Sequence, residues 1–338
     1  MQIFYLDSEF KILKMIRASN IQWRRKYYEC GSFSIQISPE YYDPLAKYIY
    51  TPDRKEIGII SQINYIKDKQ QTYIQISGLF AESLLDKAVC FSEESIQSSN
   101  VGKALIKFAQ TWYTQCECVP NIIFKNPTFY AGDTKFNAIG DNIGKKMYTM
   151  CKLHKISYFI SLEDSNLVCQ LYQGVDRSVE QSSNDVIIFS TTFNSLNKLN
   201  LLISDTDYKN HYLAKLSGQV VGSESEYVYR YTKDASITDK RWVTIDVSEI
   251  TDDYSTALNQ CSQTLINEYD KVIDLDFDTD SSNYEYLKDF DLGDIVTVLI
   301  PELGLNSSSR IIEITETFKK NSHKLSLKFG NKIITSNN

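Results

Sequence analysis

The chain has 338 residues, of which 42% are hydrophobic and 23% are charged, a balance typical of soluble globular proteins with roughly two to four domains. Its net charge of −7 argues against a nucleic-acid-binding surface that covers the whole molecule. The odd number of cysteines, seven, argues against a disulfide framework.

The start of the chain, MQIFYLDSEFKILKMIR, lacks the apolar run of a signal peptide. No stretch approaches the roughly 18 consecutive apolar residues that a membrane-spanning helix needs. We therefore expect cytoplasmic synthesis, no export by the signal-peptide route and no insertion into a membrane.

The first ninety residues predict β-structure. In GSFSIQIS, Phe33, Ile35 and Ile37 alternate with polar residues, which is the two-residue period of a half-buried strand. EIGIISQINYI and QTYIQISGL follow, separated by the polar turn KDKQ. Four or more strands in this span predict a small barrel or sandwich, with residues 79–85 as a short closing helix.

The middle of the chain, residues 96–180, predicts a mixed α+β unit. Two apolar stripes have helical spacing: Val101, Leu105, Phe108 and Trp112, then Phe136, Ile139, Ile143, Met147 and Met150. The segment YFISLEDSNLVCQLY predicts a hairpin that turns at EDSN.

From NDVIIFS onward strands dominate again, through WVTIDV. One further helix is predicted at residues 255–269, with Leu258, Cys261, Leu265 and Tyr269 on one stripe. The segments DIVTVLI, SRIIEITETF and KLSLKFG predict three final strands. In DLGDIVTV, we expect Gly293 to permit a tight turn whose backbone amides bond to Asp291 and Asp294.

The segment DLDFDTDSSNYE carries Asp274, Asp276, Asp278 and Glu285 at positions that ligate calcium in an EF-hand loop. Position 6 of such a loop should be glycine, but here it is Thr279, which is strained in a left-handed conformation. Leu275 and Phe277 alternate with the acids, and Ile273 extends the apolar side. The alternation favours a strand with one wet acidic face over a calcium loop.

Other groups of potential metal ligands or catalytic residues also have simple structural interpretations. Cys116 and Cys118 lack the two-residue spacer and the second ligand pair of a zinc site. His154, His211 and His323 are isolated, and no nucleophile motif accompanies them. The carboxylate pairs Glu163/Asp164 and Asp252/Asp253 are typical of turns and caps, although paired acids also serve glycoside hydrolysis.

The stretch QWRRKYY, Gln22 to Tyr28, mixes basic and aromatic residues that could stack on nucleic acid. In a net-acidic chain, with strand signals on both sides, it indicates an exposed strand or a contact with an acidic partner. Arg177 in GVDRS and Arg310 in SRII are expected either to pair with acids or to remain solvated. We predict no catalytic, cofactor-binding or metal-binding residues.

The order of the segments, together with short motifs, resembles the hub proteins of phage tails, in particular siphophage tail-tip hub proteins and the N-terminal part of tail-associated lysins. The motifs, in chain order, are GSFSIQI, GIISQI, IQISGL, LYQGVDRSVEQ, NDVIIFS, DYKNHYLAKLSGQ, DFDLGDIVTV, SRIIEITET and LSLKFG. They run across nearly the whole chain.

The resemblance implies a β-rich α+β fold, with two small tube-like β-barrels and an α+β domain between them. We expect a first barrel at residues 1–95, an α+β domain at 96–183, a second barrel at 184–205 plus 271–332, and an inserted α+β domain at 206–270. Because the chain stops at Asn338, we expect no lytic domain after the last strand.

In such hubs three chains form a ring whose six barrels approximate the six-fold symmetry of the tail tube. The resemblance therefore implies a non-enzymatic homotrimer in the baseplate hub or tail tip of a virion or prophage-derived tail-like particle. Expected partners are the tail tube or distal tail protein, the tape measure protein and the tail spike or tip protein, while DNA passes through without specific binding.

A channel that passes DNA should not hold it, because basic walls would bind phosphates. The acidic face of Asp274, Asp276 and Asp278 is therefore a candidate for the lumen. Two rival functions remain open: a cell-wall hydrolase whose catalytic groups come from distant positions, and a calcium-dependent module that binds surface glycans.

Overall fold

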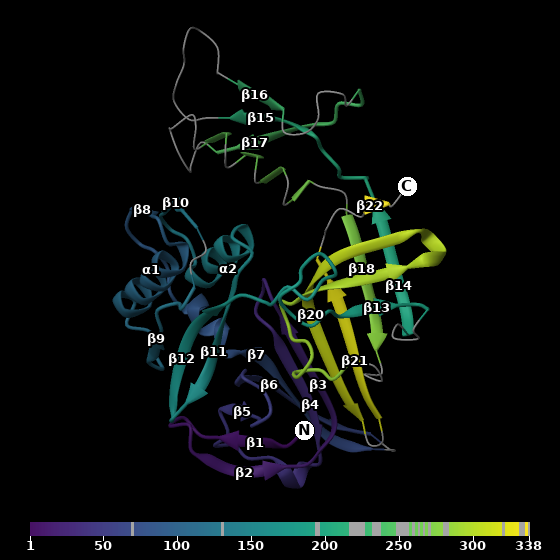
Figure 1. Ribbon diagram of the computed structural model, residues 1–338. Coiled ribbons are helices and arrows are strands. Elements are labelled where there is room, and N and C mark those ends of the chain that lie inside the picture. Colours follow the sequence, from purple (N-terminus) through teal and green to yellow (C-terminus); the bar gives the residue numbers. More distant parts are fainter. Residues whose placement is uncertain are drawn as a thin grey trace.

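The computed structural model describes residues 1–68, 71–129, 132–192, 197–215, 227–231, 238–247, 257–258, 261–262, 264–265, 268–269, 272–279, 284–319, 322–330 and 335–336 (Figure 1). Its strands gather in one large sheet and three small ones, and two α-helices cover one side of the small sheet formed by β9, β11 and β12. The prediction of a β-rich α+β fold is confirmed.

The first part of the chain forms an antiparallel sheet, one face of which is buried in an apolar core. Its elements are β1 (Ile3–Leu6), β2 (Ile12–Ile16), β3 (Ala18–Lys26), β4 (Ser32–Ile37), η1 (Pro39–Tyr41), β5 (Tyr48–Tyr50), β6 (Gly58–Lys67), β7 (Thr72–Phe80) and η2 (Ala81–Lys87). Phe33, Ile35 and Ile37 are buried with Trp23 in one apolar cluster, as the alternation predicts. The predicted closing helix is the 3₁₀ helix η2.

The middle part packs two helices on short sheets. Its elements are β8 (Glu94–Ser98), α1 (Val101–Gln115), β9 (Ile122–Phe124), β10 (Thr134–Ala138), α2 (Ile143–Leu153), β11 (Ser157–Glu163) and β12 (Asn166–Tyr172). The first predicted helix and the predicted hairpin, β11–β12, are confirmed. The second stripe is only partly helical, because the Asn142 side chain caps α2 and the helix begins at Ile143. Phe136 lies on β10, and Ile139 is exposed.

The last part returns to the large sheet. Its elements are β13 (Ile188–Ser190), β14 (Asn197–Ser204), β18 (Val272–Thr279), β19 (Ile295–Ile300), η3 (Pro301–Leu303), β20 (Leu305–Lys319), β21 (Ser322–Phe329) and β22 (Thr335–Ser336). The three predicted final strands are β19, β20 and β21.

An inserted unit lies between β14 and β18, at the top of Figure 1. Its sheet consists of β15 (His211–Lys215), β16 (Tyr227–Tyr231) and β17 (Trp242–Asp246). Within the predicted helix at 255–269, the described residues Leu258, Cys261 and Leu265 are helical and lie in one apolar cluster with Tyr212 and Ala214 of β15.

The first and last parts share one 14-stranded sheet with the order β14-β18-β21-β20-β3-β4-β7-β6-β5-β1-β2, to which β13, β19 and β22 are attached beside β20. The joint is the antiparallel pair of β20 and β3, which runs from Glu313 opposite Lys26 to Lys319 opposite Asn20. No closed barrel is found among the described strands, so the two barrels stay a prediction.

Candidate functional site

The acids of the possible calcium loop lie on β18, with Leu275 and Phe277 buried between them. Each has a neighbour on an adjoining strand: Lys328 lies 3.0 Å from Asp274, Lys324 lies 2.8 Å from Asp278, and the Asn200 amide donates to Asp276. Glu285 instead pairs with Lys288. Over the residues that the structure describes, no group of three or more potential metal ligands occurs. The predicted strand with one wet acidic face is confirmed, although the side chain of Ile273 lies outside the described residues.

The remaining candidate ligands and bases are dispersed. Cys116 donates to the Val89 carbonyl, while burial raises the pKa of Cys118. His154 ends α2, His211 lies on β15 against Trp242, and His323 lies on β21 beside Glu316.

The predicted carboxylate pairs have ordinary structural roles where they are described. Glu163 pairs with Lys125 at 2.6 Å, and Asp164 has positive φ in the β11–β12 turn. Asp252 and Asp253 lie outside the described residues.

One face of the large sheet is mainly polar across eight strands, from β14 to β6, with Leu202 of β14, opposite Asp274 and 53% exposed, as an apolar exception. On β3, β4, β7 and β6 it presents mainly amides and hydroxyls: Asn20, Gln22, Ser34, Gln36, Gln75, Ser77, Gln62 and Asn64, which the strand registers align. On β20 and β21 it continues with Thr315, Thr317, Lys324, Ser326 and Lys328. A groove of about 490 Å³ crosses it between Asn20, Gln75 and Lys324. We call this surface the polar face.

Most charges on the polar face are paired across strands, although Lys319, opposite Asn20 at the groove, has no ion pair among the described residues. Besides the pairs of β18 with β21, Arg24 of β3 makes a bidentate contact with Glu313 of β20, at 2.6 and 3.0 Å. Such exposed pairs contribute little to stability, about 0–1 kcal/mol each. Their consequence is electrostatic, because a lysine or arginine beside a carboxylate is a weaker site for phosphate than a free one.

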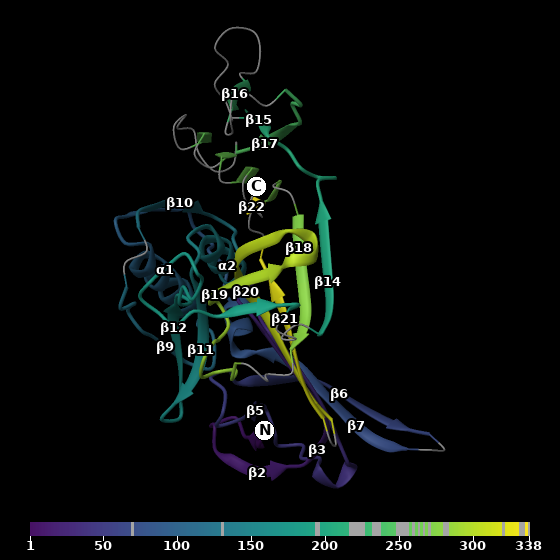
Figure 2. The ribbon, with the colours of Figure 1, turned by 45° about the vertical axis from the view of Figure 1, so that its right-hand side comes forward.

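Each end of the polar face is an open strand edge that carries apolar side chains. Among the described strands, β14 pairs only with β18, and β6 pairs only with β7 beyond its contact with β5 at Gly58 and Ile59. On β6, Ile63 and Tyr65 are 46% and 59% exposed, opposite Ile76 and Ile74. On β14, Ile203 is 54% exposed. Figure 2 shows the β6–β7 hairpin projecting from the body.

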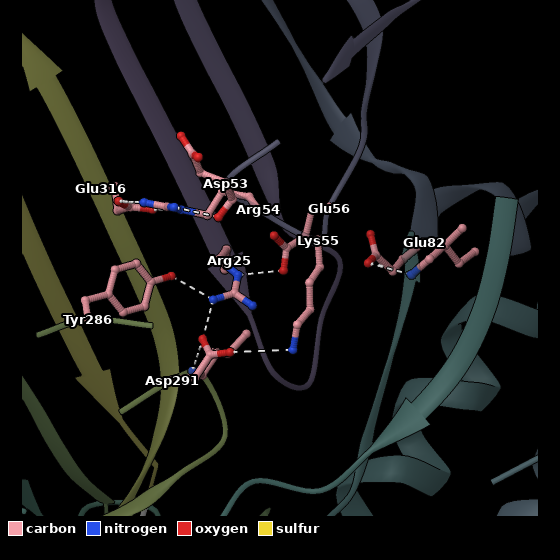
Figure 3. A network of polar contacts seen from close by, with 11 residues as sticks. Arg25, Asp53, Arg54, Lys55, Glu56, Glu82, Tyr286, Asp291 and Glu316 are labelled. Carbon is pink, nitrogen blue, oxygen red and sulfur yellow. Dashed lines mark hydrogen bonds and ion pairs between the residues drawn. The ribbon is translucent and has the colours of Figure 1, made fainter. Parts of the chain in front are cut away.

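The basic stretch Gln22–Tyr28 lies at the joint of the sheet and is largely covered. Arg25 is 4% exposed, and its guanidinium donates to Glu56 at 2.6 Å, Tyr286 at 2.7 Å and Asp291 at 2.5 Å (Figure 3). Arg24 is exposed as predicted, but the acidic partners of both arginines belong to this chain. The sequence offered no signal for this network, because Arg25 lies 266 positions from Asp291.

A second arginine reinforces the joint. Arg54 makes two hydrogen bonds with Glu316, at 2.7 and 2.5 Å, and Glu316 is fully buried on β20. Burial would raise the pKa of Asp291, but the Arg25 guanidinium outweighs this effect and holds the pKa below its usual value. Asp291 is therefore an ionised partner of a buried cation.

Glu82 on η2 lies beside this junction and is also buried. One of its oxygens accepts from the Ile160 amide at 3.1 Å, and the other has no hydrogen-bond partner among the described residues. Burial, with a smaller effect from Glu56, raises the pKa of Glu82 to about 8. Glu82 is therefore protonated near neutral pH and lies between the large sheet and the α+β unit.

The DLGDIVTV turn is built as predicted. Gly293 has φ +93°, and an added Cβ would lie 2.3 Å from the Tyr27 ring, so both conformation and space require glycine. Asp294 accepts from the amides of Val175 and Asp291, at 2.8 and 3.0 Å.

The two arginines singled out in the sequence both lie at this turn. Arg177 pairs with Asp294 at 3.0 Å, as expected. Arg310 donates instead to the Gly293 carbonyl and lies over the Tyr27 ring, 5.2 Å from its centroid.

A family match spans nearly the whole chain: residues 1–331 fit the model of the Siphovirus ReqiPepy6 Gp37-like proteins. The chain belongs to this family. The predicted resemblance to phage tail proteins is thereby confirmed. None of the curated proteins matches the chain.

Solved structures of phage tail proteins share the fold. The chain is similar to the 43 kDa tail protein of prophage MuSo2 from Shewanella oneidensis, with a TM-score of 0.64 and 12% identity over 98% of each chain. It is also similar to a tail protein from Neisseria meningitidis MC58, with a TM-score of 0.61 and 14% identity over 97% of this chain and 95% of that one. Prophage tail protein gp18 from Listeria monocytogenes EGD-e gives 0.58 and 13%, over 98% and 96%.

No helix within the described residues has both the length and the apolar character needed to cross a membrane.

Replacing Arg25 with methionine should lower the free energy of unfolding by about 3–5 kcal/mol, because Glu56 would remain buried without its cation and the half-buried Asp291 would keep only the more distant Lys55. The matched control, Arg24→Met, removes the exposed pair with Glu313 and should cost at most about 1 kcal/mol. Urea unfolding followed by circular dichroism measures both values. Equal costs would contradict the role assigned to the buried junction.

Replacing Glu82 with glutamine should flatten the pH dependence of stability. Because its pKa of about 8 lies above the ordinary 4.5, the folded state keeps a proton that the unfolded state loses between these values. The free energy of unfolding of the parent protein should therefore fall as pH rises from about 4.5 to about 8. Glu163→Gln is the control, since Lys125 lowers the pKa of Glu163 and its contribution changes below this window. A parent protein as pH-dependent as Glu82→Gln in this window would refute the assignment.

Proposed function

We propose that this tail protein is a structural hub in which three copies form a ring around the DNA channel and join the tail tube to the tail tip or spike. The polar face carries this proposal. It is continuous over eight strands, its carboxylates are matched by cross-strand cations or an amide, and its other side is the apolar core. A wall of this kind is wet enough to line a channel, and most of its cations apart from Lys319 are paired with carboxylates, which weakens their attraction for DNA phosphates.

The surface proposed to line the lumen thus extends beyond the acidic strand β18. Asp274, Asp276 and Asp278 form part of it, but Lys324 and Lys328 balance them. The predicted acidic wall is better described as a neutral polar wall. Amides and hydroxyls over β3, β4, β7 and β6 give the remaining surface hydrogen-bonding capacity without charge.

The two open edges suggest how copies join. An unprotected edge strand with exposed apolar residues is a template for another strand. Pairing of β6 of one copy with β14 of the next would cover Ile63, Tyr65 and Ile203 and continue the polar face between copies. This contact is heterologous, and such contacts give a closed ring when the rotation closes.

The arrangement of strands supports three copies. Each chain contributes two four-stranded portions on either side of the β20–β3 joint, β14-β18-β21-β20 and β3-β4-β7-β6. In a trimer these give six similar portions, which suits contact with a six-fold tail tube. We assign the two portions to the two predicted tube-like barrel domains.

The four domains predicted from the sequence are retained in this proposal at 1–95, 96–183, 184–205 plus 271–332, and 206–270. Four apolar clusters support such a division, although the cluster of the α+β unit also includes residues of the first part: Leu6, Tyr48, Ile57, Ala81, Leu84, Leu85, Ala88 and Cys90. The partners remain the tube or distal tail protein, the tape measure protein and the spike or tip protein. A location in the virion tail, synthesis in the host cytoplasm and a non-enzymatic role complete the proposal.

Lysine at either proposed joining edge should prevent ring formation. Electron microscopy of the purified protein should show three-fold rings with a central pore, and light scattering should give three times the chain mass. Ile63→Lys and Ile203→Lys should each yield folded monomers, because a charge would be placed in an apolar contact. Ile12→Lys on β2, a site 60% exposed, is the control and should still form rings. Monomeric parent protein, or rings that survive both edge changes, would refute the proposed ring.

Removing the carboxylates that pair with two lysines should make the polar face bind DNA more strongly. In the double variant Asp274→Asn with Asp278→Asn, Lys328 and Lys324 lose their ion-pair partners. The slope of log affinity against log salt for duplex DNA should steepen by up to about 2, since each added phosphate contact contributes about 0.9. Fluorescence anisotropy at several salt concentrations measures it.

The control double variant, Glu163→Gln with Asp246→Asn, removes the carboxylates that pair with Lys125 and Lys215, which belong to separate units away from the polar face. It should change the slope less, because the two lysines do not act on one surface. A polar-face variant that behaves like the control would contradict the charge-balance argument.

A further inference from the structure

We infer that an apolar patch at the end of the α+β unit docks a basic, apolar segment of another tail protein. The inference rests on the proposed function as a tail component. The patch consists of Val89, Phe91, Val119 and Ile139, which are 40%, 64%, 71% and 62% exposed. We call it the α+β patch.

Two of the segments that carry the patch are joined by backbone hydrogen bonds. The Cys90 amide donates to the Asp141 carbonyl at 2.9 Å, and the Gly140 amide donates to the Cys90 carbonyl at 2.6 Å. Cys90 is buried, while its neighbours Val89 and Phe91 are exposed. The apolar residues on either side of Cys90 therefore point outward together, next to the segment that carries Ile139.

The third segment, after α1, is tied to the first. Cys116 donates from its thiol to the Val89 carbonyl at 3.3 Å, and the Lys87 ammonium donates to the Val119 carbonyl at 2.8 Å. Residues 87–91, 116–119 and 139–141 thus form one connected surface rather than scattered exposed side chains.

A buried tryptophan holds one side chain of the α+β patch in place. The Phe91 ring lies edge-on against Trp112 of α1, with ring centroids 4.9 Å apart. Trp112 is buried, and its indole N–H donates to the Glu94 carboxylate. A surface held in this way loses little side-chain freedom on binding, which favours its use as a docking site.

The charges around the α+β patch specify the partner. Glu93 and Glu117 are exposed, each two positions from a patch residue, and neither has an ion pair within the described part of the chain. Asp141 is already paired with Lys146 at 3.2 Å. Lys87 donates to the Val119 carbonyl but keeps its charge, so two unpaired acids stand against one lysine at the rim. The rim therefore has an excess of unpaired acid, and a partner that covers the patch needs lysine or arginine beside its apolar residues.

A neighbouring copy is not the expected occupant. In both views α1 and β10 lie on the opposite side of the molecule from β14, one of the two proposed joining edges (Figures 1 and 2). Ring closure through β6 and β14 would leave the α+β patch uncovered. An apolar surface of this kind on a tail component is best explained by a second type of contact.

Photocrosslinking in assembled tails tests the inference. Benzoylphenylalanine at position 139 should crosslink to a peptide of another polypeptide that has apolar residues and more lysine and arginine than acid. The same probe at Leu303, 59% exposed on η3, is the positional control and should not give this crosslink. A crosslink only to another copy of this chain, or to an acidic segment, would overturn the inference.

Two failures can be told apart. If the chain is absent from the tails, the proposed function fails and the inference falls with it. If the chain is present but position 139 gives no crosslink, only the docking surface is refuted.

Charge reversal at the rim provides a second test. Glu93→Lys combined with Glu117→Lys should reduce the crosslink yield about tenfold, because like charges would face each other in the contact. Glu40→Lys, at an exposed acid on η1, is the matched control and should leave the yield unchanged. Unchanged melting temperatures would show that both variants are folded. An unaltered yield in the rim variant would refute a basic partner.

Discussion

The pairing of β20 with β3 is the constraint on which the rest of the structure depends. It joins Asn20–Lys26 to Glu313–Lys319, two segments almost 300 positions apart in the chain, and turns two sets of strands into one sheet. Beside this seam, Arg25 and Arg54 bind carboxylates from both parts of the chain. Backbone pairing fixes the register. The ion pairs Arg25–Asp291 and Arg54–Glu316 penalise separation, because each would lose a close opposite charge at a largely buried position.

This seam gives the sheet two contrasting faces. Because side chains alternate along a strand, one register places the apolar residues of both parts in the core and the polar ones on the same outer face. A shift by one residue at β20–β3 would expose Trp23 and bury Arg24, so the polar face exists only in this register. Its ion pairs have the same origin, since the register places lysines of β21 diagonal to aspartates of β18, and Arg24 of β3 diagonal to Glu313 of β20.

Local order was predictable from the sequence, whereas long-range pairing was not. The alternation in β4 and β18 identified their buried faces, and the poor EF-hand pattern at Thr279 correctly favoured a strand. The apolar stripe through Phe136 and Ile139 wrongly predicted that the second helix would include these residues. Helical spacing does not reveal that the Asn142 cap starts this helix only at Ile143. Arg25 looked like part of a surface motif, since nothing local indicates partners 31 and 266 positions away. Periodicity also cannot show which strands adjoin, so two barrels were expected where the described strands form one continuous sheet.

The open edges of β6 and β14 distinguish this sheet from that of a protein that stays monomeric. Proteins that must stay monomeric usually protect edge strands with proline, inward charges or short length, because unpaired amides and carbonyls recruit other strands. Neither β6 nor β14 contains proline, and the single lysine of each, Lys67 and Lys198, stands at or next to a strand end. β6 extends over ten residues with Ile63 and Tyr65 uncovered. Retaining such edges would cost solubility if the chain acted alone. The same edges in a ring would be covered by the neighbouring copies, so the edge chemistry favours assembly over a free binding module or enzyme.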